Sequence, residues 1–293
     1  MRTETAPNRP ETVRLADYAP PTWLVDRVRL VFDLAPSATR VSARIAFRRN
    51  PAHDGGHPDL RLDGRGLALL GATIDGEAVD ESAISRDGEG LTVPAGMLPG
   101  DAFTWECLTE IDPAANTALE GLYVSRAMFC TQCEAEGFRK ITFYPDRPDV
   151  MAPFSVRIEA DRETCPVLLS NGNPGETGAL DGRRHFAEWH DPHPKPSYLF
   201  ALVAGDLVAG EDSFTTRSGR EVALRVWVRP GDEEKRGYAM ESLKRAMRWD
   251  EEVYGREYDL DVFQIVAVDD FNMGAMENKG LNIFNAKYVL ASP

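Results

Sequence analysis

Alternation of apolar and polar residues with a period of two dominates the chain from Trp23 to about Ala209. This period places successive side chains on opposite faces of a sheet, so it predicts half-buried strands. The clearest apolar series are Val28, Leu30, Phe32 and Leu34, then Val41, Ala43, Ile45 and Phe47, and finally Phe154, Val156, Ile158 and Ala160. Clusters of Gly, Pro, Asp and Asn separate the strands as turns. Many short strands with turns between them favour a β-sandwich.

A different pattern begins after Asp206, where a hairpin and a long helix are predicted. The chain is strand-like on both sides of the turn-prone dipeptide Ser218-Gly219. Residues 232–254 then show a helical period, and Gly255 stands where the residue after a helix end is expected. Ala239, Leu243, Ala246, Asp250 and Val253 recur at helical spacing, and they form the predicted apolar stripe of this helix, which only Asp250 interrupts.

The last part of the chain is again strand-like. Residues 262–268 are too apolar for a strand with one exposed face, and residues 281–290 form a further predicted strand. Strands mixed with a helix indicate α+β character. We therefore divide the chain into an N-terminal β-sandwich domain, residues 1–206, and a second domain, residues 207–293, whose single helix cannot cover both faces of its sheet.

Composition narrows the possible classes of function. The chain has 33 Lys and Arg against 47 Asp and Glu, a net charge of −14, so its field would repel nucleic acid and anionic lipid and attract a cationic substrate group. No apolar run is long enough to span a membrane, and the start of the chain lacks the apolar segment of a secretory signal. The 4 cysteines are typical of reduced thiols. These features predict a cytoplasmic protein.

Residues 271–280 carry the most specific pattern, Phe-Asn-Met-Gly-Ala-Met-Glu-Asn-Lys-Gly. By itself, a single Glu among glycines and apolar residues is typical of a solvated loop. The string Gly-Ala-Met-Glu-Asn at residues 274–278, however, resembles the exopeptidase signature of the aminopeptidase N family of zinc metallo-aminopeptidases. Its position directly after an apolar strand is the position that this resemblance implies.

Three more segments resemble the same family, in the same order along the chain. Gln-Cys-Glu-Ala-Glu at residues 132–136 is similar to the second amine-binding motif, Tyr-Pro-Asp-Arg-Pro-Asp at residues 144–149 to the segment after it, and residues 199–206 to the domain junction. Together the matches cover about residues 23–293. The resemblance implies a mainly β protein with a saddle-like N-terminal β-sandwich, followed by the incomplete α+β start of a thermolysin-like catalytic domain.

The resemblance also implies roles for residues of both domains. Glu277 and Glu134 would accept charge-assisted hydrogen bonds from the free ammonium of a peptide, each worth roughly 1.5 to 3 kcal/mol. Gln132 would line the first specificity pocket or bond the substrate backbone, and Met273 would form the floor of that pocket. The other implied substrate-binding residues are Gly274, Ala275, Met276 and Asn278. The small Gly274 and Ala275 would let a substrate approach as an added strand, whereas Met276 is better explained as a core residue.

The zinc site of the family has no counterpart in this sequence. Zinc aminopeptidases hold the metal through a His-Glu-x-x-His helix and a downstream Glu, and that motif is absent from these 293 residues. The five histidines are His53, His57, His185, His190 and His193, and all precede the predicted second domain. His53 and His57 have helical spacing, but two glycines between them argue against a helix. We expect neither a metal ligand nor a catalytic residue in this chain, which would stop before the zinc-binding segment.

Two other interpretations stay open. Cys130-Thr-Gln-Cys133 has the spacing of zinc-binding and thiol-exchange sites, which Cys107 and Cys165 could complete only if the fold brought them together. A non-catalytic β-sandwich that binds peptides is also compatible with the composition. The resemblance instead predicts a monomeric zinc aminopeptidase that releases N-terminal residues from peptides with a free N-terminus, with this chain supplying amine recognition. Neither nucleic acid nor a membrane is an expected partner.

Overall fold

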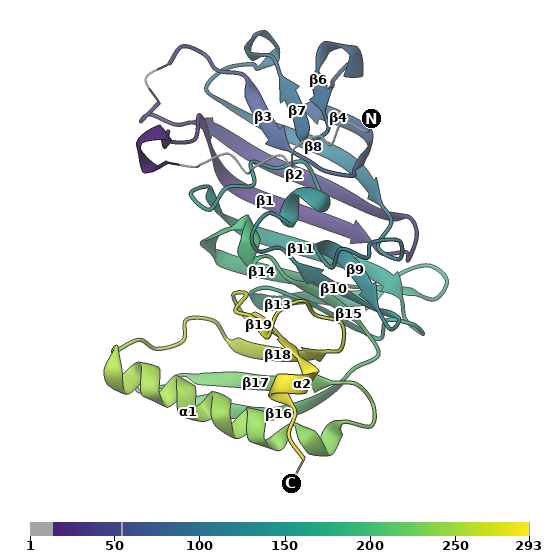
Figure 1. Ribbon diagram of the computed structural model, residues 1–293, viewed down its shortest axis with the longest axis vertical. Helices are drawn as coiled ribbons and strands as arrows, with labels where there is room; N and C mark the ends of the chain where they lie inside the picture. The colour runs from purple at the N-terminus through teal and green to yellow at the C-terminus, as the bar shows by residue number, and fades with distance from the viewer. Residues whose placement is uncertain (1–13, 54, 293) are drawn as a thin grey trace, which may run out of the picture.

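The computed structural model describes residues 14–53 and 55–292, which form an elongated molecule (Figure 1). Strands from the first part of the chain lie at one end, and the sheet formed by the last part lies at the other end together with the C-terminus (Figure 1). In the described ranges, 20 strands accompany two α-helices, so the prediction of a mainly β protein is confirmed.

The largest layer is a sheet of eight strands. Its order is β13 (Asn173–Ala179), β14 (Arg184–Pro196), β11 (Met151–Asp161), β1 (Trp23–Asp33), β2 (Thr39–Arg49), β8 (Ala102–Ile111), β4 (Ala68–Ile74) and β5 (Glu77–Ala78). Neighbouring strands are antiparallel except that β1 runs parallel to β11, with Val28 opposite Phe154. The predicted alternation is confirmed, because the three apolar series on β1, β2 and β11 are buried.

Two smaller sheets cover the apolar face of the large sheet. One has the order β3 (Leu60–Asp63), β7 (Gly90–Val93) and β6 (Ser85–Asp87), and the other the order β12 (Val167–Ser170), β15 (Leu202–Gly205), β10 (Met128–Gln132) and β9 (Gly121–Ser125). One hydrophobic core contains residues of all three sheets. In it, Phe200 stacks on Phe32 with 5.8 Å between ring centroids and meets Phe138 edge-on at 5.3 Å. The layers form the predicted β-sandwich.

The last part of the chain forms a separate sheet of five strands. Its order is β16 (Val208–Thr215), β17 (Glu221–Val228), β18 (Val262–Val268), β20 (Leu281–Asn285) and β19 (Ala275–Met276). The predicted hairpin is confirmed by the antiparallel pair β16–β17, while β17, β18 and β20 are parallel. Strand β18 is apolar except for the buried Gln264, because Val266 and Val268 pack toward the sandwich, whereas Ile265 and Ala267 pack on the opposite side.

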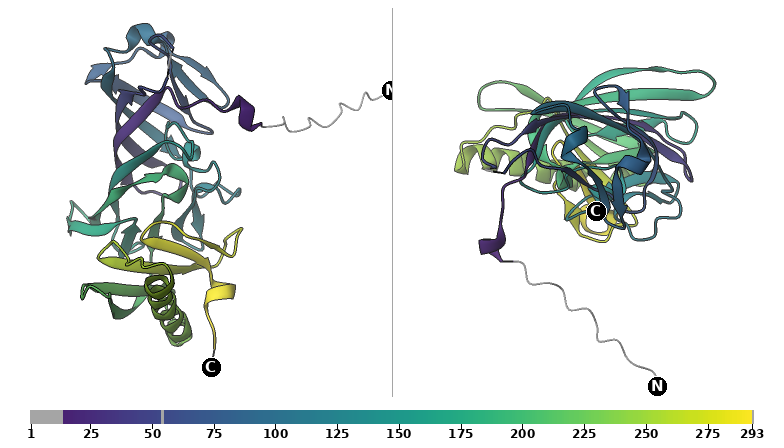
Figure 2. Two further views of the ribbon diagram at one scale, coloured as in Figure 1. Left: turned by 90° about the vertical axis from the view of Figure 1, so that its left-hand side faces the viewer. Right: turned by 90° about the horizontal axis from the view of Figure 1, so that it is seen from above.

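Helix α1 (Gly237–Val253) packs on the face of this sheet that points away from the sandwich (Figure 2). The prediction of Gly255 as the terminating residue is confirmed by its φ of +62°, a conformation that favours glycine. The helix starts later than predicted, because residues 233–235 form a 3-10 turn. The buried residues of α1 are Ala239, Met240, Leu243, Met247 and Glu251.

The predicted stripe of α1 is therefore only partly right. Ala239 and Leu243 are buried, but the predicted apolar members Ala246 and Val253 are exposed, as is Asp250, which interrupts the stripe. The row of residues that faces the sheet instead continues from Leu243 in steps of four, to Met247 and Glu251. Glu251 can be buried there because the backbone N–H of Arg217 donates to both of its carboxylate oxygens at 3.2 Å.

The prediction of one strand over residues 281–290 is also partly wrong. Strand β20 ends at Asn285, and the short helix α2 (Ala286–Val289) follows. The side chain of Asn285 accepts a hydrogen bond of 3.1 Å from the backbone N–H of Lys287 and so caps the helix. Further 3-10 helices occupy Leu15–Asp17, Glu81–Ala83, Ala95–Met97, Phe138–Lys140 and Ser197–Leu199. No helix in the described ranges has both the length and the apolar character needed to cross a membrane.

Candidate functional site

Strand β10 and the turn after it present the first group of predicted substrate-binding residues. Gln132 ends the strand and is 1% exposed, whereas Glu134 lies in the turn with an exposed side chain. The Glu134–Ala135 peptide bond is cis. The turn folds back closely on the strand, because a Cβ atom at Gly137 would lie 2.4 Å from the backbone oxygen of Gln132. Glu134 is thus held at the surface, directly beside a buried strand end.

The segment of residues 271–280, which joins β18 to β20, carries the second group. Its residues Ala275 and Met276 form β19, the edge strand of the five-stranded sheet. Just before this strand, the oxygen of Gly274 accepts a hydrogen bond of 3.0 Å from the backbone N–H of Asn285. The outer edge of β19 pairs with no strand in the described ranges, so an extended peptide could add to it.

Burial divides the 271–280 segment into inward-facing and outward-facing side chains. Met276 is fully buried, as its interpretation as a core residue expects, and Asn278 is 1% exposed. The exposed members are Asn272, Met273, Gly274 and Glu277, while Ala275 is half-buried. The segment therefore has an inward-facing set of side chains that supports it and an outward-facing set that can contact a ligand.

One direct contact joins the two groups. Gln132 Nε2 donates a hydrogen bond of 2.8 Å to Met273 Sδ, across the boundary between the sandwich and the five-stranded sheet. Gln132 Oε1 is buried and has no hydrogen-bond partner in the part of the chain that the structure describes. A buried carbonyl oxygen without a partner costs free energy, so this atom is an available acceptor beside the contact.

Glu134 and Glu277 are both exposed, and neither carboxylate makes a hydrogen bond or an ion pair within the described residues. By contrast, Glu136 in the same turn as Glu134 pairs with Arg139 at 3.3 Å. The chain thus places uncompensated negative charge in both groups. Such charge stabilises a cation that can reach it.

Two anchors that the sequence analysis did not identify hold the 271–280 segment against the sandwich, the first between buried sandwich residues and the exposed Asp270. At its start, the Ser125 hydroxyl donates to Asp270 Oδ2 at 2.8 Å and accepts from the Asp270 backbone N–H at 3.3 Å. Tyr123 donates to the Asp270 oxygen at 2.9 Å, and burial raises the pKa of this phenol far above its ordinary value, so it stays a donor. Arg229 lies beside this contact and donates hydrogen bonds to Asp269 Oδ2 at 2.6 Å and to the backbone oxygen of Ser125 at 2.9 Å.

The second anchor lies at the other end of the segment. Asn171 is 1% exposed, and its Nδ2 donates to the backbone oxygens of Leu199 at 2.9 Å and Lys279 at 2.8 Å. Its Oδ1 accepts from the backbone N–H of Ala201 at 2.7 Å. The side chain, which directly follows β12, therefore joins the residues just before β15 to the segment.

The sequence held only weak signals for these anchors. Asp269 and Asp270 directly follow a buried strand, where carboxylates often carry a function, but nothing pointed to Ser125 as their partner. Asn171 lies in a cluster of Asn, Gly and Pro that indicates a turn. Because the partners are 145 and 108 residues apart in the chain, no local pattern could connect them.

The residues of this chain do not fit the zinc ion that the resemblance implies. No group of three or more His, Cys, Asp or Glu side chains in the described ranges could hold a metal ion. The histidines instead contact other parts of the fold: His185 Nε2 lies 2.8 Å from the Cys165 oxygen, and His57 packs edge-on against Trp23. The described residues therefore provide no set of side chains that would hold this zinc ion.

The Cys-x-x-Cys pair lies in the core. Cys130 and Cys133 are both fully buried, and burial raises the pKa of Cys130 to about 12 and that of Cys133 well above its ordinary value. Thiol exchange and metal binding both need an accessible thiolate. This environment therefore gives no support to the interpretation of the pair as a redox or metal site.

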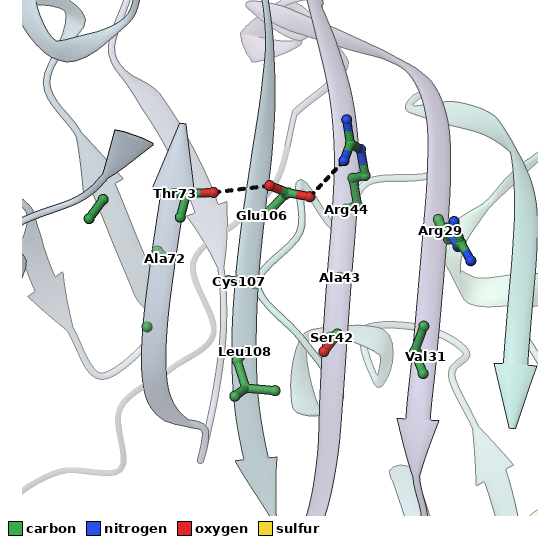
Figure 3. A pocket seen from close by; sticks show the side chains of 12 residues that line it. Arg29, Val31, Ser42, Ala43, Arg44, Ala72, Thr73, Glu106, Cys107 and Leu108 are labelled. Carbon is green, nitrogen blue, oxygen red and sulfur yellow. Dashed lines mark hydrogen bonds and ion pairs between the residues drawn. The ribbon is translucent and has the colours of Figure 1, made fainter. Parts of the chain in front are cut away.

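A hollow on the outer face of the eight-stranded sheet lies away from both groups (Figure 3). In it, Glu106 of β8 accepts hydrogen bonds from Arg44 at 2.9 Å and from Thr73 at 3.1 Å (Figure 3). No predicted site residue lines this hollow. Arg44 and Glu106 pair with each other, whereas Arg29, which also lines the hollow, makes no ion pair within the described residues.

Both parts of the chain match models of one peptidase family. The Peptidase M1 N-terminal domain model matches residues 60–199, and the Peptidase family M1 domain model matches residues 238–293. The chain belongs to the peptidase M1 family. Among curated relatives, this M1 chain is 58% identical to the aminopeptidase N of Caulobacter vibrioides over 100% of its own length and 33% of the relative. It is 52% identical to the aminopeptidase N of Escherichia coli over 97% of its length and 32% of the relative.

The M1 chain thus spans about a third of the length of the curated relatives it matches. A crystal structure of Legionella pneumophila aminopeptidase A in complex with aspartic acid matches its fold with a TM-score of 0.91 at 36% identity. That match covers 96% of this chain and 33% of the Legionella chain. The architecture is an N-terminal β domain followed by the start of an M1 catalytic domain.

Proposed function

We propose that this chain is the amine-recognition part of a metallo-aminopeptidase, in which Glu134 and Glu277 bind the free N-terminal ammonium of a peptide. The observation that carries the proposal is a pair of exposed, unpaired carboxylates on two surfaces that the Gln132–Met273 hydrogen bond joins. The aminopeptidases N among the relatives support the reaction class. A free ammonium would gain two charge-assisted hydrogen bonds, whereas a blocked N-terminus would leave both carboxylates unpaired.

The other predicted residues would orient the substrate. The first residues of the peptide would pair with the open edge of β19, where Gly274 and Ala275 leave room for a backbone. Gln132 Oε1 would accept a backbone N–H, and Met273 would contact the first side chain of the peptide. This arrangement would allow only the first peptide bond to reach the catalytic groups, because the carboxylates stop the chain at its terminus.

We also propose zinc as the metal of the whole enzyme, held by residues outside this chain, where it would supply a Lewis acid. A cytoplasmic location is supported by the four cysteines, which are all free and buried. The predicted monomeric state would be measured by sedimentation or by light scattering.

Replacing Glu277 by Gln tests the amine-binding role in a zinc-loaded protein extended through the rest of the M1 domain. The change keeps the shape and removes the charge, so kcat/KM for a peptide with a free N-terminus should fall by about ten- to a hundredfold. Glu134→Gln should act in the same direction. Inhibition by a free amino acid amide should weaken equally, while inhibition by its N-acetylated form should stay unchanged.

Glu136→Gln is the matched control, because Glu136 lies in the same exposed turn as Glu134 but pairs with Arg139. Its kcat/KM should stay within about threefold of the starting protein, as for most surface changes. The amine-binding role is wrong if Glu277→Gln preserves both kcat/KM and the preference for the free amide.

A further inference from the structure

The two proposed ammonium-binding carboxylates lie on different sheets. Glu134 follows β10 of the sandwich, and Glu277 follows β19 of the five-stranded sheet. The chain between them is long and runs through both sheets, so it does not fix their spacing. The spacing must be set by contacts between the sandwich and the 271–280 segment.

The β9–β10 hairpin makes such contacts at both of its ends. Ser125 and Met128 are opposite each other where the two strands join, and Gln132 is opposite Gly121 at the far end. Ser125 contacts the residue just before the segment, Asp270, and Gln132 contacts Met273 within it. The hairpin therefore lies along the start of the segment, with its open end next to Glu134.

The Ser125–Asp270 contact restricts both distance and orientation. One hydroxyl, 1% exposed, donates to the side chain of Asp270 and accepts from its backbone N–H, so sliding or turning of the segment breaks at least one bond. Tyr123 fixes the carbonyl of the same residue through a third bond. Three bonds from one strand thus converge on Asp270.

We propose that Ser125 and Asp270 are positioning residues that set the spacing between Glu134 and Glu277, and thereby the selectivity for a free ammonium. The inference rests on the proposed function of the two carboxylates. An ammonium can bond both of them only if each lies within about 3 Å of it, and charge-assisted bonds weaken steeply beyond that distance. A displacement of the segment by about 1 Å would leave the ammonium bonded to one carboxylate at a time.

Ser125→Ala removes the two hydroxyl bonds and tests the inference in the extended, zinc-loaded protein. Its kcat/KM should fall by about tenfold, mainly through a higher KM, and the preference for a free amide over its N-acetylated form should shrink. Thr39→Val is the matched control, because the Thr39 hydroxyl is equally buried and makes the same reciprocal pair with Ala35, at 2.7 Å and 3.1 Å, far from the site. It should leave that preference unchanged.

Combining Ser125→Ala with Glu277→Gln separates positioning from a general loss of stability. If Ser125 acts through the carboxylate pair, the double variant should be little worse than Glu277→Gln alone. If the fold decreases in kcat/KM of the two single variants multiply in the double variant, the positioning role is wrong while the amine-binding role stays intact. If Glu277→Gln alone has no effect, the proposed function fails first, and the positioning role fails with it.

Two further measurements complete the test: the first does not use Ser125→Ala, and the second does not need zinc. Asp270→Asn keeps an oxygen acceptor and should retain most of the selectivity, whereas Asp270→Ala should lose it; equal loss in both would overturn the inference. In the 293-residue chain, Ser125→Ala should speed hydrogen exchange of the Asn285 N–H, which bonds Gly274, by about tenfold or more. Exchange as slow as in Thr39→Val would contradict a positioning role.

Discussion

Asn171 shows how much one buried side chain can contribute to the placement of the candidate site. Its amide makes three hydrogen bonds, so Asn171→Ala would strand two carbonyls and one N–H in the core. We expect the free energy of unfolding to fall by about 3 kcal/mol, because each buried unsatisfied group costs about 1 to 3 kcal/mol. Urea denaturation of the 293-residue chain measures this change.

Asn173→Ala provides the comparison for Asn171→Ala. Asn173 also bonds the five-stranded sheet, through two contacts with Asp261 at 2.9 Å and 2.8 Å, but both are exposed to water. Asn173→Ala should lower the free energy of unfolding by about 1 kcal/mol or less, since water replaces the missing partner. Equal losses for the two variants would mean that the Asn171 bonds contribute no more than surface contacts.

Single residues also mark the limit of prediction from the sequence. Gln132 and Met273 belong to motifs whose order of residues is itself the signal, and the structure brings the two together. Ser125 belongs to no motif, because its role depends on a partner that becomes a neighbour only when two sheets pack. Motif residues were therefore predictable as candidates, whereas the residues that support them were not.

Among the elements, helix α1 gives a direct test of which face packs on the sheet. Leu243 is buried against the sheet, so Leu243→Ala should lower the free energy of unfolding by about 2 to 4 kcal/mol through lost burial and a cavity. Ala246 is exposed, and Ala246→Ser should change the free energy of unfolding by about 0.5 kcal/mol or less. Thermal or urea unfolding of both variants checks the orientation, and a larger loss at Ala246 would contradict it.

The type of each element was more predictable than which of its side chains are buried and where it ends. Strand β18 matches its predicted range because a short, mostly apolar run rich in β-branched residues is typical of a strand covered on both sides. The predicted stripe of α1 is partly wrong because Ala246 and Met247 are neighbouring apolar residues. A helical row through either of them fits the apolar pattern almost equally well. The end of β20 was missed because the capping bond of Asn285 competes with an apolar sequence that favours continued strand.

The sandwich and the five-stranded sheet share part of one hydrophobic core. Val262, Val266 and Val268 of β18 pack in the same cluster as the sandwich strands, although the sheets have no strand in common. Division of the chain into domains at residues 206 and 207 remains a prediction. A shared core of this kind makes the relative placement of the two sheets a property of the whole molecule.

The buried pair Asp191–Lys195 predicts how global stability depends on pH. Lys195 Nζ lies 3.0 Å from Asp191 Oδ2 and 4.0 Å from the ring centroid of Phe154, and burial lowers the pKa of Lys195 from 10.5 to about 8. Between these values the unfolded chain holds a proton that the native chain has released, so the free energy of unfolding rises with pH. Relative to the double variant Asp191→Asn with Lys195→Met, the gain from about pH 7.5 to about pH 9.5 should be about 2 kcal/mol.

Urea denaturation at the two pH values measures that gain. The double variant serves as the reference because it removes both charges at once and leaves no unpaired ion in the core. Parallel pH curves for the two proteins would show that Lys195 keeps its ordinary proton affinity when buried.

The parallel pairing of β1 with β11 has a consequence for how the chain is synthesised. Val28 and its partner Phe154 are 154 − 28 = 126 residues apart, while the other edge of β1 pairs with β2 after a short turn. At about 5 to 20 residues per second, a ribosome takes several seconds or more to deliver β11. During that time the hairpin of β1 and β2 exposes an apolar face, and the edge of β1 that later pairs with β11 stays open, which is the situation that chaperones recognise. Pairing of strands so distant in the chain also slows folding, so the large sheet is completed late.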